Sequence, residues 1–263
     1  MKIAILGGGN MGSAFAKGIY QNIDKCTVGV SDTNKDKLKQ ISAGNSIVVS
    51  SKNMDIVDGA DIVILAIKPQ DFGTLLTELK NKIPKKAIVI SIAAGVKISK
   101  IKNGLKHSLV VRVMPNLPAL IGKGMSSWFG PGLNYAQKNS VKLILKSIGE
   151  EVEVKSEDEI DKATAISGSG PAYVFYFAEK MIKAGVKLGL KEDVSRKLTI
   201  QMLLGATELL SKSEDNEKTL RERVTSKKGT TEQAIKTFDK KKMGATIEAA
   251  VKNAYKRAKE LSK

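Results

Sequence analysis

Two residue types that carry much enzyme chemistry are almost missing from this chain, which has one cysteine, Cys26, and one histidine, His107, in 263 residues. A single cysteine excludes an intrachain disulfide and a metal site built from several cysteines of one chain. With one histidine, a Ser-His-Asp triad has to run through His107, and zinc would need mostly carboxylate ligands. We therefore predict no metal site, and we interpret His107, in "GLKHSLVV", as a surface loop residue rather than a catalytic one.

Long hydrophobic runs are also absent. The longest apolar windows, "DIVILAI" and "AIVISIAAGV", are too short to span a bilayer. A strand pattern starts at Lys2 without a cleavable leader before it. The sequence therefore predicts a globular protein with a cytoplasmic location.

Negative charge is scarce: the chain has 44 Lys and Arg residues but only 27 Asp and Glu residues, so its net charge is +17. Such a balance raises nucleic-acid binding as an alternative. The lysines are spread along nearly every predicted helix, however, and the few aromatic residues do not interleave with them as in a base-stacking surface. We interpret the charge as a lysine-rich solvated surface that attracts small anions.

Short apolar runs rich in β-branched residues alternate with helical patterns from Lys2 to about Ser156. Continuous apolar runs of this kind are typical of strands buried on both faces of a sheet. The alternation predicts a doubly wound, Rossmann-type parallel sheet. The predicted strands are residues 2–7, 26–31, 46–50, 61–67, 87–93, 108–114, 124–130 and 151–155.

Helical periodicity dominates after about Ile160. Helices are predicted from Pro171, over 191–212 and over 243–262. The segment "AYVFYFA" is apolar nearly all round, which is typical of a helix buried on every side. We predict a nucleotide-binding domain over 1–156 and an all-α domain over 157–263 that pairs with a second copy. The preceding "SGSGP" (167–171) is interpreted as a close-packed helix entry, not as a serine nucleophile.

A glycine motif, G-x-G-x-x-G, follows the first predicted strand in "AILGGGNMGSAFAKGI". Gly7 permits a tight turn, Gly9 lets the main chain approach a pyrophosphate, and Gly12 allows close helix–strand packing. The helix that starts there offers unpaired N–H groups to phosphate. The motif predicts binding of a dinucleotide, NADP or NAD.

Asp32 leaves the choice of dinucleotide open. Twenty residues beyond Gly12, a carboxylate is placed to bind the ribose 2′-OH of NAD and to repel the 2′-phosphate of NADP. The donors and cations around it, among them Ser31, Lys35 and Lys37, suit that phosphate. Asp32 is equally well explained as the N-cap of a helix starting at Thr33.

Six segments resemble the pyrroline-5-carboxylate reductase family in order and approximate spacing, over essentially the whole chain. They are "GGGNMGSAF" (7–15), "AIKPQ" (66–70), "SIAAGV" (91–96), "VRVMPNLPALIGKGMS" (111–126), "AISGSGPAYVF" (165–175) and "RVTSKKGTT" (223–231). The resemblance implies hydride transfer from NAD(P)H to the C=N carbon of L-1-pyrroline-5-carboxylate, giving L-proline; of the two cofactors we slightly favour NADPH. It also implies homodimers that interlock through the C-terminal helices, with each active site drawing on both subunits and higher oligomers left open.

The resemblance also implies positions for the site. The cofactor-binding positions expected from the motif and the resemblance are Leu6, Gly7, Gly8, Gly9, Asn10, Met11 and Gly12 at the pyrophosphate, Ser31 and Asn53 at the adenosine ribose and its phosphate, Ala66, Ile67, Lys68 and Pro69 over the cofactor's middle, and Ala93 and Ala94 beside the nicotinamide. The substrate-binding positions are Asn116, Glu214, Ser226, Gly229, Thr230 and Thr231, with Thr231 as the catalytic hydroxyl near the ring nitrogen.

Two residues depart from the family pattern. Lys228 stands where the family usually has glycine, so that either it adopts an ordinary conformation or the loop is strained by roughly 1 kcal/mol. Leu117 replaces the threonine usual in "MPNTP" and removes a hydroxyl beside the substrate. Both changes bear on affinity and geometry more than on the class of reaction.

The implied mechanism needs no strong general acid, because a protonated cyclic imine accepts hydride directly. Catalysis then consists of holding two reactants in line. Main-chain N–H groups near Gly229 would bind the substrate carboxylate, and a helix starting at about Thr231 would assist.

Alternative functions for the chain are a 3-hydroxyacid dehydrogenase, a broader imine reductase, a non-catalytic nucleotide sensor, or a nucleic-acid-binding protein.

Overall fold

The computed structural model describes residues 1–262, and their contacts form two compact units. The first, which we call the sheet unit, contains Met1–Pro171 and the chain from Asn253 onward. The second, the helical unit, is Ala172–Lys252. Among the described residues, no helix is both long and apolar enough to cross a membrane.

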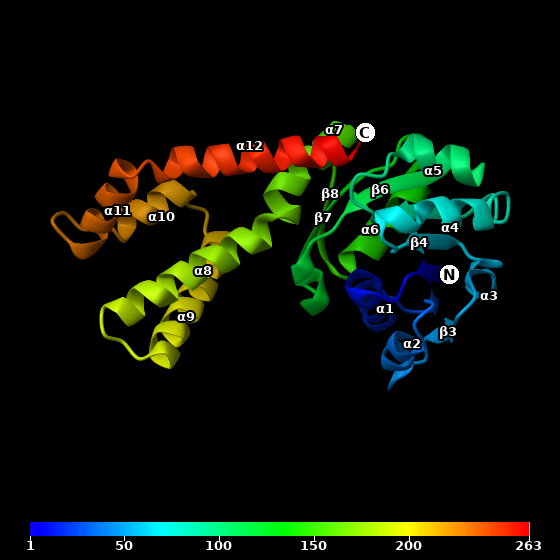
Figure 1. The fold of residues 1–263 in the computed structure, drawn as a ribbon, viewed down its shortest axis with the longest axis horizontal. Coiled ribbons are helices and arrows are strands. Elements are labelled where there is room, and N and C mark those ends of the chain that lie inside the picture. Colours follow the sequence, from blue (N-terminus) through cyan, green and yellow to red (C-terminus); the bar gives the residue numbers. More distant parts are fainter. Residues whose placement is uncertain (263) are drawn as a thin grey trace. The chain divides into compact units, whose positions relative to one another are not determined.

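A sheet with helices around it forms the centre of the sheet unit (Figure 1). It has eight strands in the order β3-β2-β1-β4-β5-β6-β7-β8. The strands are β1 (Lys2–Leu6), β2 (Thr27–Ser31), β3 (Val48–Ser50), β4 (Ile62–Leu65), β5 (Ile88–Ser91), β6 (Val110–Met114), β7 (Gly124–Phe129) and β8 (Gly149–Glu153). All eight predicted strands are confirmed, with boundaries that differ by a few residues.

One feature of the predicted sheet needs correction, because it is not parallel throughout. Strand β7 runs antiparallel to β6, and β8 is parallel to β7. The chain between Met114 and Gly124 holds only the short 3₁₀ helix η2 (Leu117–Ile121), whereas a parallel return needs a crossover of about a dozen residues or more. The short connection therefore forces the antiparallel pair.

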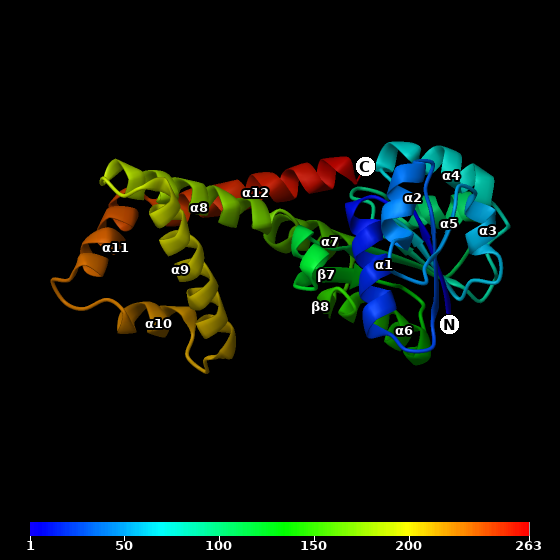
Figure 2. The same ribbon diagram turned by 90° about the horizontal axis from the view of Figure 1, so that it is seen from below.

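Helices cover both faces of the sheet, as a doubly wound fold requires. They are α1 (Asn10–Asn22), α2 (Lys35–Ser42), α3 (Asn53–Val57), α4 (Phe72–Leu79), α5 (Ile98–Leu105), α6 (Tyr135–Lys146) and α7 (Glu157–Ala163), with the 3₁₀ turn η1 (Pro69–Asp71) and the π-helical turn η3 (Thr164–Gly168). Helices α1, α2 and α6 pack on one face, and α3, α4 and α5 pack on the other. Figure 2 shows α1 and α6 on the opposite side of the sheet from α4 and α5.

Side chains of β1 alternate between the two hydrophobic cores. Ile3 and Ile5 belong to the core under α1, α2 and α6, whereas Ala4 and Leu6 belong to the core under α3, α4 and α5. Because both faces are covered, every position from Ile3 to Leu6 is apolar, and this part of the strand is a continuous hydrophobic run.

The helical unit is built from α8 (Gly170–Lys187), α9 (Glu192–Lys212), α10 (Glu217–Arg223), α11 (Thr230–Lys240) and the first part of α12 (Met243–Leu261). The three long helices predicted from the sequence are confirmed. Helices α8 and α9 touch each other, because Ser195 Oγ donates to the carbonyl of Ile182 at 2.9 Å. No hydrophobic side chain of this unit is buried, although the structure describes all of its residues.

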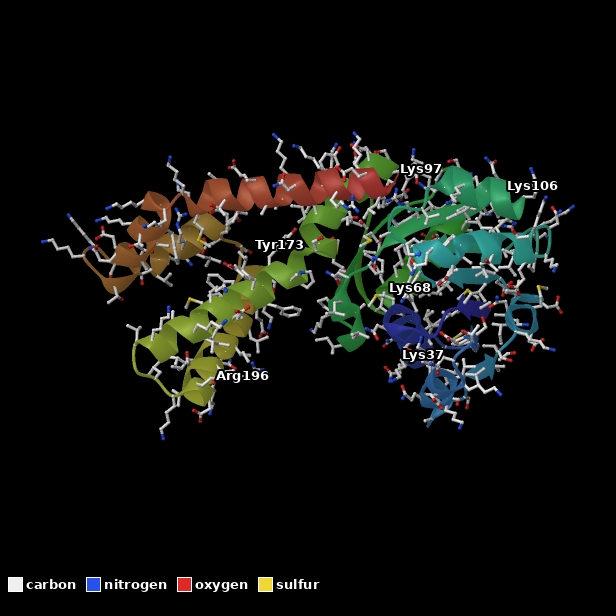
Figure 3. All side chains as sticks on the ribbon, viewed as in Figure 1. Lys37, Lys68, Lys97, Lys106, Tyr173 and Arg196 are labelled. Atoms are coloured by element: carbon white, nitrogen blue, oxygen red, sulfur yellow. The ribbon has the colours of Figure 1, made fainter. Side chains whose placement is uncertain are left out.

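Lysines of the sheet unit come from several of its helices and loops. The labelled Lys37, Lys68, Lys97 and Lys106 lie in different parts of it (Figure 3).

Candidate active site

The glycine motif connects β1 to α1 by a turn that is pinned to the end of β2. The N–H of Gly7 donates to the carbonyl of Ser31 at 2.7 Å, and the N–H of Gly8 donates to Asp32 Oδ2 at 2.7 Å. Gly9 then caps α1, and the N–H of Ser13 closes the first helical hydrogen bond to its carbonyl at 2.8 Å.

Packing explains two of the motif's glycines but not the third. A Cβ on Gly7, whose φ is +110°, would lie 2.5 Å from the carbonyl oxygen of Ala66, and a Cβ on Gly12 would lie 1.8 Å from that of Gly7. A Cβ on Gly9 would meet no protein atom within 4 Å. The protein itself therefore does not require glycine at position 9, and the open space fits close approach of a pyrophosphate to the main chain.

The start of α1 is suited to an anion. The amides of Asn10, Met11 and Gly12 precede the first helical hydrogen bond and have no intrahelical acceptor. The first turn of α1 contains no acidic residue, so nothing there opposes the positive end of the helix dipole. These residues can hold the pyrophosphate of a dinucleotide.

A chain of hydrogen bonds fixes the two positions expected near the adenosine ribose. Ser31 Oγ donates to Asn53 Oδ1 at 2.7 Å, and Asn53 Nδ2 donates to Glu78 Oε2 at 2.9 Å. Ser31 is buried, Asn53 is half-buried, and Glu78 on α4 is exposed. The orientation of the Asn53 amide is therefore set from both sides.

Asp32 does not cap the following helix, so that interpretation was wrong. Helix α2 starts at Lys35, and its N-cap is Asn34, whose Oδ1 accepts from the amides of Asp36 and Lys37. Asp32 instead accepts from the amide of Gly8 and, at 2.8 Å, from that of Asn34, while Lys37 Nζ lies 3.7 Å from its Oδ2. Its carboxylate thus links the glycine turn to the start of α2.

The remaining cofactor positions follow the carboxyl ends of neighbouring strands. The N–H of Ala66, after β4, donates to the carbonyl of Leu6 at 2.8 Å, and Pro69 opens η1. Ile67 is half-buried and Lys68 exposed; after β5, Ala93 is buried and Ala94 exposed. Since Leu6, Leu65 and Ser91 are in register across β1, β4 and β5, the structure brings these loops to one edge of the sheet, where α/β folds bind ligands.

Asn116, after β6, has both ends of its amide engaged. Nδ2 donates to the carbonyl of Ser167 at 3.0 Å, and Oδ1 accepts from the amide of Met125 at 2.9 Å. The side chain therefore ties the turn after β6 to η3 and β7. Leu117 next to it begins η2 and is 44% exposed.

The expected carboxylate loop lies entirely in the helical unit and leads into α11. Gly229 is the N-cap, so the amides of Thr230, Thr231 and Glu232 precede the first helical hydrogen bond and lack an intrahelical acceptor. Within residues 1–262, the hydroxyls of Ser226, Thr230 and Thr231 have no hydrogen-bond partner. The structure therefore gathers free donors on this short segment.

Lys228 in this loop has φ at +61°, in the left-handed region. Its amide donates to Glu232 Oε2 at 3.0 Å, and the amide of Gly229 donates to the carbonyl of Ser226 at 3.0 Å. These bonds hold the loop in a tight turn. Of the two conformations considered for Lys228, the structure has the strained one.

Glu214 lies apart from this loop in sequence and is exposed between α9 and α10. Its neighbour Asp215 pairs instead with Arg223 of α10. In the part of the chain that the structure describes, no hydrogen bond or ion pair joins Glu214 to residues 226–231.

Two other sequence interpretations have clear outcomes. His107 is buried, not a surface residue, and its Nε2 lies 2.8 Å from the carbonyl oxygen of Ala87. The "SGSGP" segment enters a helix as predicted: Ser167 Oγ donates to the carbonyl of Ala163 at 3.1 Å, and α8 starts at Gly170. The side chains of His107 and Ser167 therefore both bond to main-chain carbonyls.

Sequence reasoning missed a buried ionic cluster around Arg112 of β6. Its Nη2 lies 2.5 Å from Asp161 Oδ1 and donates to Ser262 Oγ at 3.1 Å, while its Nη1 lies 3.3 Å from Glu157 Oε1. A signal was present in "VVRVM", because an arginine in the middle of a buried strand requires partners. Those partners lie far along the chain, so the sequence alone did not name them.

Comparisons with known proteins agree with this architecture. A family model described as pyrroline-5-carboxylate reductase dimerisation matches residues 157–261, and one described as NADP oxidoreductase coenzyme F420-dependent matches residues 2–95. A pyrroline-5-carboxylate reductase of Pseudomonas aeruginosa is 35% identical over 99% of this chain and 97% of its own length.

Two solved structures are similar over nearly their whole length. A pyrroline-5-carboxylate reductase from Coxiella burnetii superposes with a TM-score of 0.93 at 35% identity, covering 100% of this chain and 98% of the other. A pyrroline carboxylate reductase from Plasmodium falciparum, with NADP bound, gives a TM-score of 0.86 at 31% identity with the same coverage.

Proposed function

The chain belongs to the pyrroline-5-carboxylate reductase family, an oxidoreductase family of proline biosynthesis. We propose that, in the reduction of L-1-pyrroline-5-carboxylate to L-proline, the sheet unit binds the cofactor and the helical unit binds the substrate. When bound, NAD(P)H supplies the hydride that the C=N carbon accepts. The observation that carries the proposal is that unpaired main-chain amides begin two helices, α1 in the sheet unit and α11 in the helical unit. One set suits the cofactor's pyrophosphate and the other suits the substrate's carboxylate.

The sheet unit binds the cofactor in this proposal. The turn from Leu6 to Gly12 holds the pyrophosphate, Ser31 and Asn53 lie at the adenosine ribose, and residues 66–69 cover the middle of the dinucleotide. Ala93 and Ala94 flank the nicotinamide. Asn116 acts by fixing the turn after β6 against η3 and β7, as its two engaged hydrogen bonds support.

The loop from Ser226 to Thr231 holds the substrate. The free amides at the start of α11 bind its carboxylate, and the hydroxyls of Ser226 and Thr230 add donors. Thr231 Oγ orients the ring nitrogen so that the C=N carbon faces the hydride. Because a protonated imine is already electrophilic, the residues need only hold and align it. Glu214, which is exposed between α9 and α10, is proposed as an acidic residue close to this loop.

NADPH is the preferred cofactor in this proposal. The Asp32 carboxylate already accepts from two amides and lies beside Lys37, so its capacity to bind a ribose 2′-OH is reduced. Lys35 and Lys37 supply positive charge for a 2′-phosphate.

The active enzyme is a homodimer through the C-terminal helices, with each site drawing on both subunits. The match of residues 157–261 to a dimerisation family supports this arrangement, as does the absence of buried hydrophobic side chains in the fully described helical unit. We propose a cofactor-binding domain over 1–156 and a dimerisation and substrate domain over 157–263. The proposed location of the enzyme is the cytoplasm.

The test is a spectrophotometric assay of the purified protein with pyrroline-5-carboxylate and either NADPH or NADH in parallel. We expect L-proline with both cofactors and a kcat/KM that is about tenfold higher with NADPH, the ratio that one charge-assisted contact to phosphate supplies. Oxidation of a 3-hydroxyacid with NADP⁺, without imine reduction, would contradict the proposal.

A further inference from the structure

The loop between β5 and α5, residues 92–97, is held by contacts from distant parts of the chain. Ala93 and Val96 are buried in the core under α3, α4 and α5. The N–H of Ile98, which opens α5 directly after the loop, donates to Glu157 Oε1 of α7 at 3.0 Å. The far end of the loop is therefore fixed by a side chain about sixty residues away.

The middle of this loop rests on the last turn of α12. Gly95 has φ at +74°, and a Cβ added to it would lie 2.4 Å from the carbonyl oxygen of Leu261 and 3.1 Å from that residue's Cβ. The Cα of Gly95 is thus pressed against the main chain of α12. Any larger side chain has to push the loop and the helix apart.

Arg112 joins the groups that hold the loop from both sides. It is 3% exposed, and it lies in β6 in register with Ser91, the last residue of β5. Its guanidinium contacts Glu157, which holds the start of α5, and Asp161 and Ser262, which hold the end of α12. Ser262 Oγ is also 2.9 Å from Asp161 Oδ1 of α7 and 3.0 Å from the carbonyl oxygen of Ala258 in α12. Ser262 therefore bonds both to α7 and to the last turn of α12.

Stability alone does not explain a buried cluster of this kind, because well-packed apolar residues of similar volume are often as stabilising as a buried ion pair. What the cluster provides is a fixed relative position for β6, α7, the start of α5 and the end of α12. The loop of residues 92–97 lies between those fixed elements.

We propose that Arg112 is a positioning residue for hydride transfer, which acts through Glu157 and the last turn of α12 to fix loop 92–97 against the nicotinamide. The inference rests on the proposed function, because it takes Ala93 and Ala94 as neighbours of that ring. It adds that a segment belonging to the dimerisation match, residues 157–261, supports the cofactor loop of the same chain.

Gly95→Ala tests the contact with α12, and Gly44→Ala is its matched control. The two glycines have φ values of +74° and +73°, so alanine is equally strained at both, but a Cβ on Gly44 would meet no atom within 4 Å. We expect Gly95→Ala to lower kcat by about ten- to a hundredfold, the loss typical of a reacting group misplaced by about 1 Å. Gly44→Ala should retain the wild-type kcat.

Ser262→Ala tests the cluster more gently, with Ser147→Ala as its control, since both are buried serines that bond to a carbonyl of the preceding helical turn. Arg112→Lys keeps the charge but loses the planar fork that reaches three partners. We expect Ser262→Ala and Arg112→Lys to lower kcat and Ser147→Ala to leave it unchanged.

Two readouts separate positioning from a general loss of structure. With NADPH carrying deuterium at the transferred position, the kinetic isotope effect on kcat should rise in Gly95→Ala, Ser262→Ala and Arg112→Lys, because hydride transfer becomes slower relative to the other steps. The affinity for 2′-phosphoadenosine 5′-diphosphoribose, which lacks the nicotinamide, should stay at the wild-type value.

The inference is overturned if Gly95→Ala and Ser262→Ala match their controls, and Arg112→Lys matches the wild type, in kcat and isotope effect. It is also overturned if affinity for the nicotinamide-free probe falls in parallel with activity. A wild-type protein that reduces the imine while these variants behave as controls overturns this inference alone. A wild-type protein that does not reduce it overturns the proposed function and this inference together.

Discussion

Lys228 holds a main-chain conformation that lysine rarely adopts, with φ at +61°. The left-handed region costs an L-residue with a Cβ about 1 kcal/mol or more, and glycine avoids that cost. The amide of Lys228 donates to Glu232 Oε2, so the bend is held by a hydrogen bond to the first turn of α11. The loop therefore keeps a glycine-like geometry without the glycine.

Replacing Lys228 with glycine should relieve this strain at little cost. The gain of about 1 kcal/mol is offset in part by the larger entropy loss of glycine on folding, so the free energy of unfolding should change by less than about 1 kcal/mol. We expect kcat/KM to be equal to the wild-type value or higher. Denaturant unfolding and steady-state kinetics measure both quantities.

Lys227→Gly is the matched control, because Lys227 does not have a positive φ and gains nothing from glycine. It should be less stable than Lys228→Gly. An inactive Lys228→Gly protein with an intact fold would mean that the lysine side chain has a direct role in the reaction.

Thr231→Ala tests the proposed alignment of the substrate. Removing the hydroxyl should lower kcat/KM for pyrroline-5-carboxylate by roughly ten- to a thousandfold, as loss of an oriented hydrogen bond does, while the dissociation constant for NADPH stays nearly unchanged. Thr237→Ala on the same helix is the control, since its Oγ1 only donates to the carbonyl of Gln233. Wild-type turnover in Thr231→Ala would exclude the assigned role.

Single residues were the least predictable level of this molecule. The glycine motif was recognisable because its spacing reflects a main-chain requirement, and the gap in space at Gly9 agrees with it. Asp32, His107 and Arg112 were misread or missed, since their roles depend on partners that sequence distance does not reveal. His107, for example, is buried with its ring nitrogen next to the carbonyl of Ala87, a partner that lies twenty residues earlier in the chain.

At the level of elements, α7 and α12 are joined by a second, half-exposed cluster centred on Asp158. Lys162 lies 2.7 Å from Asp158 Oδ2, and the hydroxyl of Tyr255 donates to Oδ1 at 2.6 Å. The hydrogen bonds from Lys162 and Tyr255 lower the pKa of Asp158 to about 2. The charged carboxylate is therefore favoured in the folded protein.

This lowered pKa predicts a stabilisation that is lost in acid. The unfolded chain binds a proton at Asp158 near pH 3.9, so the contribution is complete above about pH 4 and disappears as the pH falls toward 2. Asp158→Asn should melt at a lower temperature than wild type at pH 7, and the difference should shrink over that window. Melting temperatures measured across the range test it.

Tyr255→Phe removes one of the two hydrogen bonds and should show part of the same pH dependence. A melting-temperature difference between Asp158→Asn and wild type that is equal at pH 7 and in acid would contradict the assignment.

Whole elements were largely predictable because their signals are local. Short runs, most of them rich in β-branched residues, identified all eight strands, and helical periodicity identified α8, α9 and α12. The reversed direction of β7 was not predicted, although the short connection after β6 contained the reason. The start of α2 was misplaced because Asp32 and Asn34 are both good caps, and only the hydrogen bonds decide between them.

At the scale of the whole molecule, the helical unit is incomplete as a single copy. Its residues are all described, yet none of its hydrophobic side chains is buried, and a hollow of about 570 Å³ lies between α8 and α9. A unit of this size without a core of its own cannot offset the entropy lost on folding. The apolar surface is therefore the part of the chain best suited to pairing with a second copy.

Leu204→Glu tests this surface. Leu204 lines the hollow and is 59% exposed, whereas Leu143 on α6 of the sheet unit is 46% exposed and serves as the control. A charge buried in a dimer contact costs about 2 kcal/mol or more, so Leu204→Glu should weaken dimerisation by about thirtyfold or more. Sedimentation velocity should detect monomers of Leu204→Glu and dimers of Leu143→Glu; dimers of both at equal strength would exclude this interface.

The central claim is that the reaction's chemistry comes from the cofactor and from an electrophilic substrate, while the chain only binds and aligns them. Its most direct test is to follow deuterium from NADPH labelled at the transferred position into the product by mass spectrometry. The account predicts L-proline with one deuterium at C5, the former C=N carbon. Proline without deuterium, or oxidation of NADPH without proline, would contradict it.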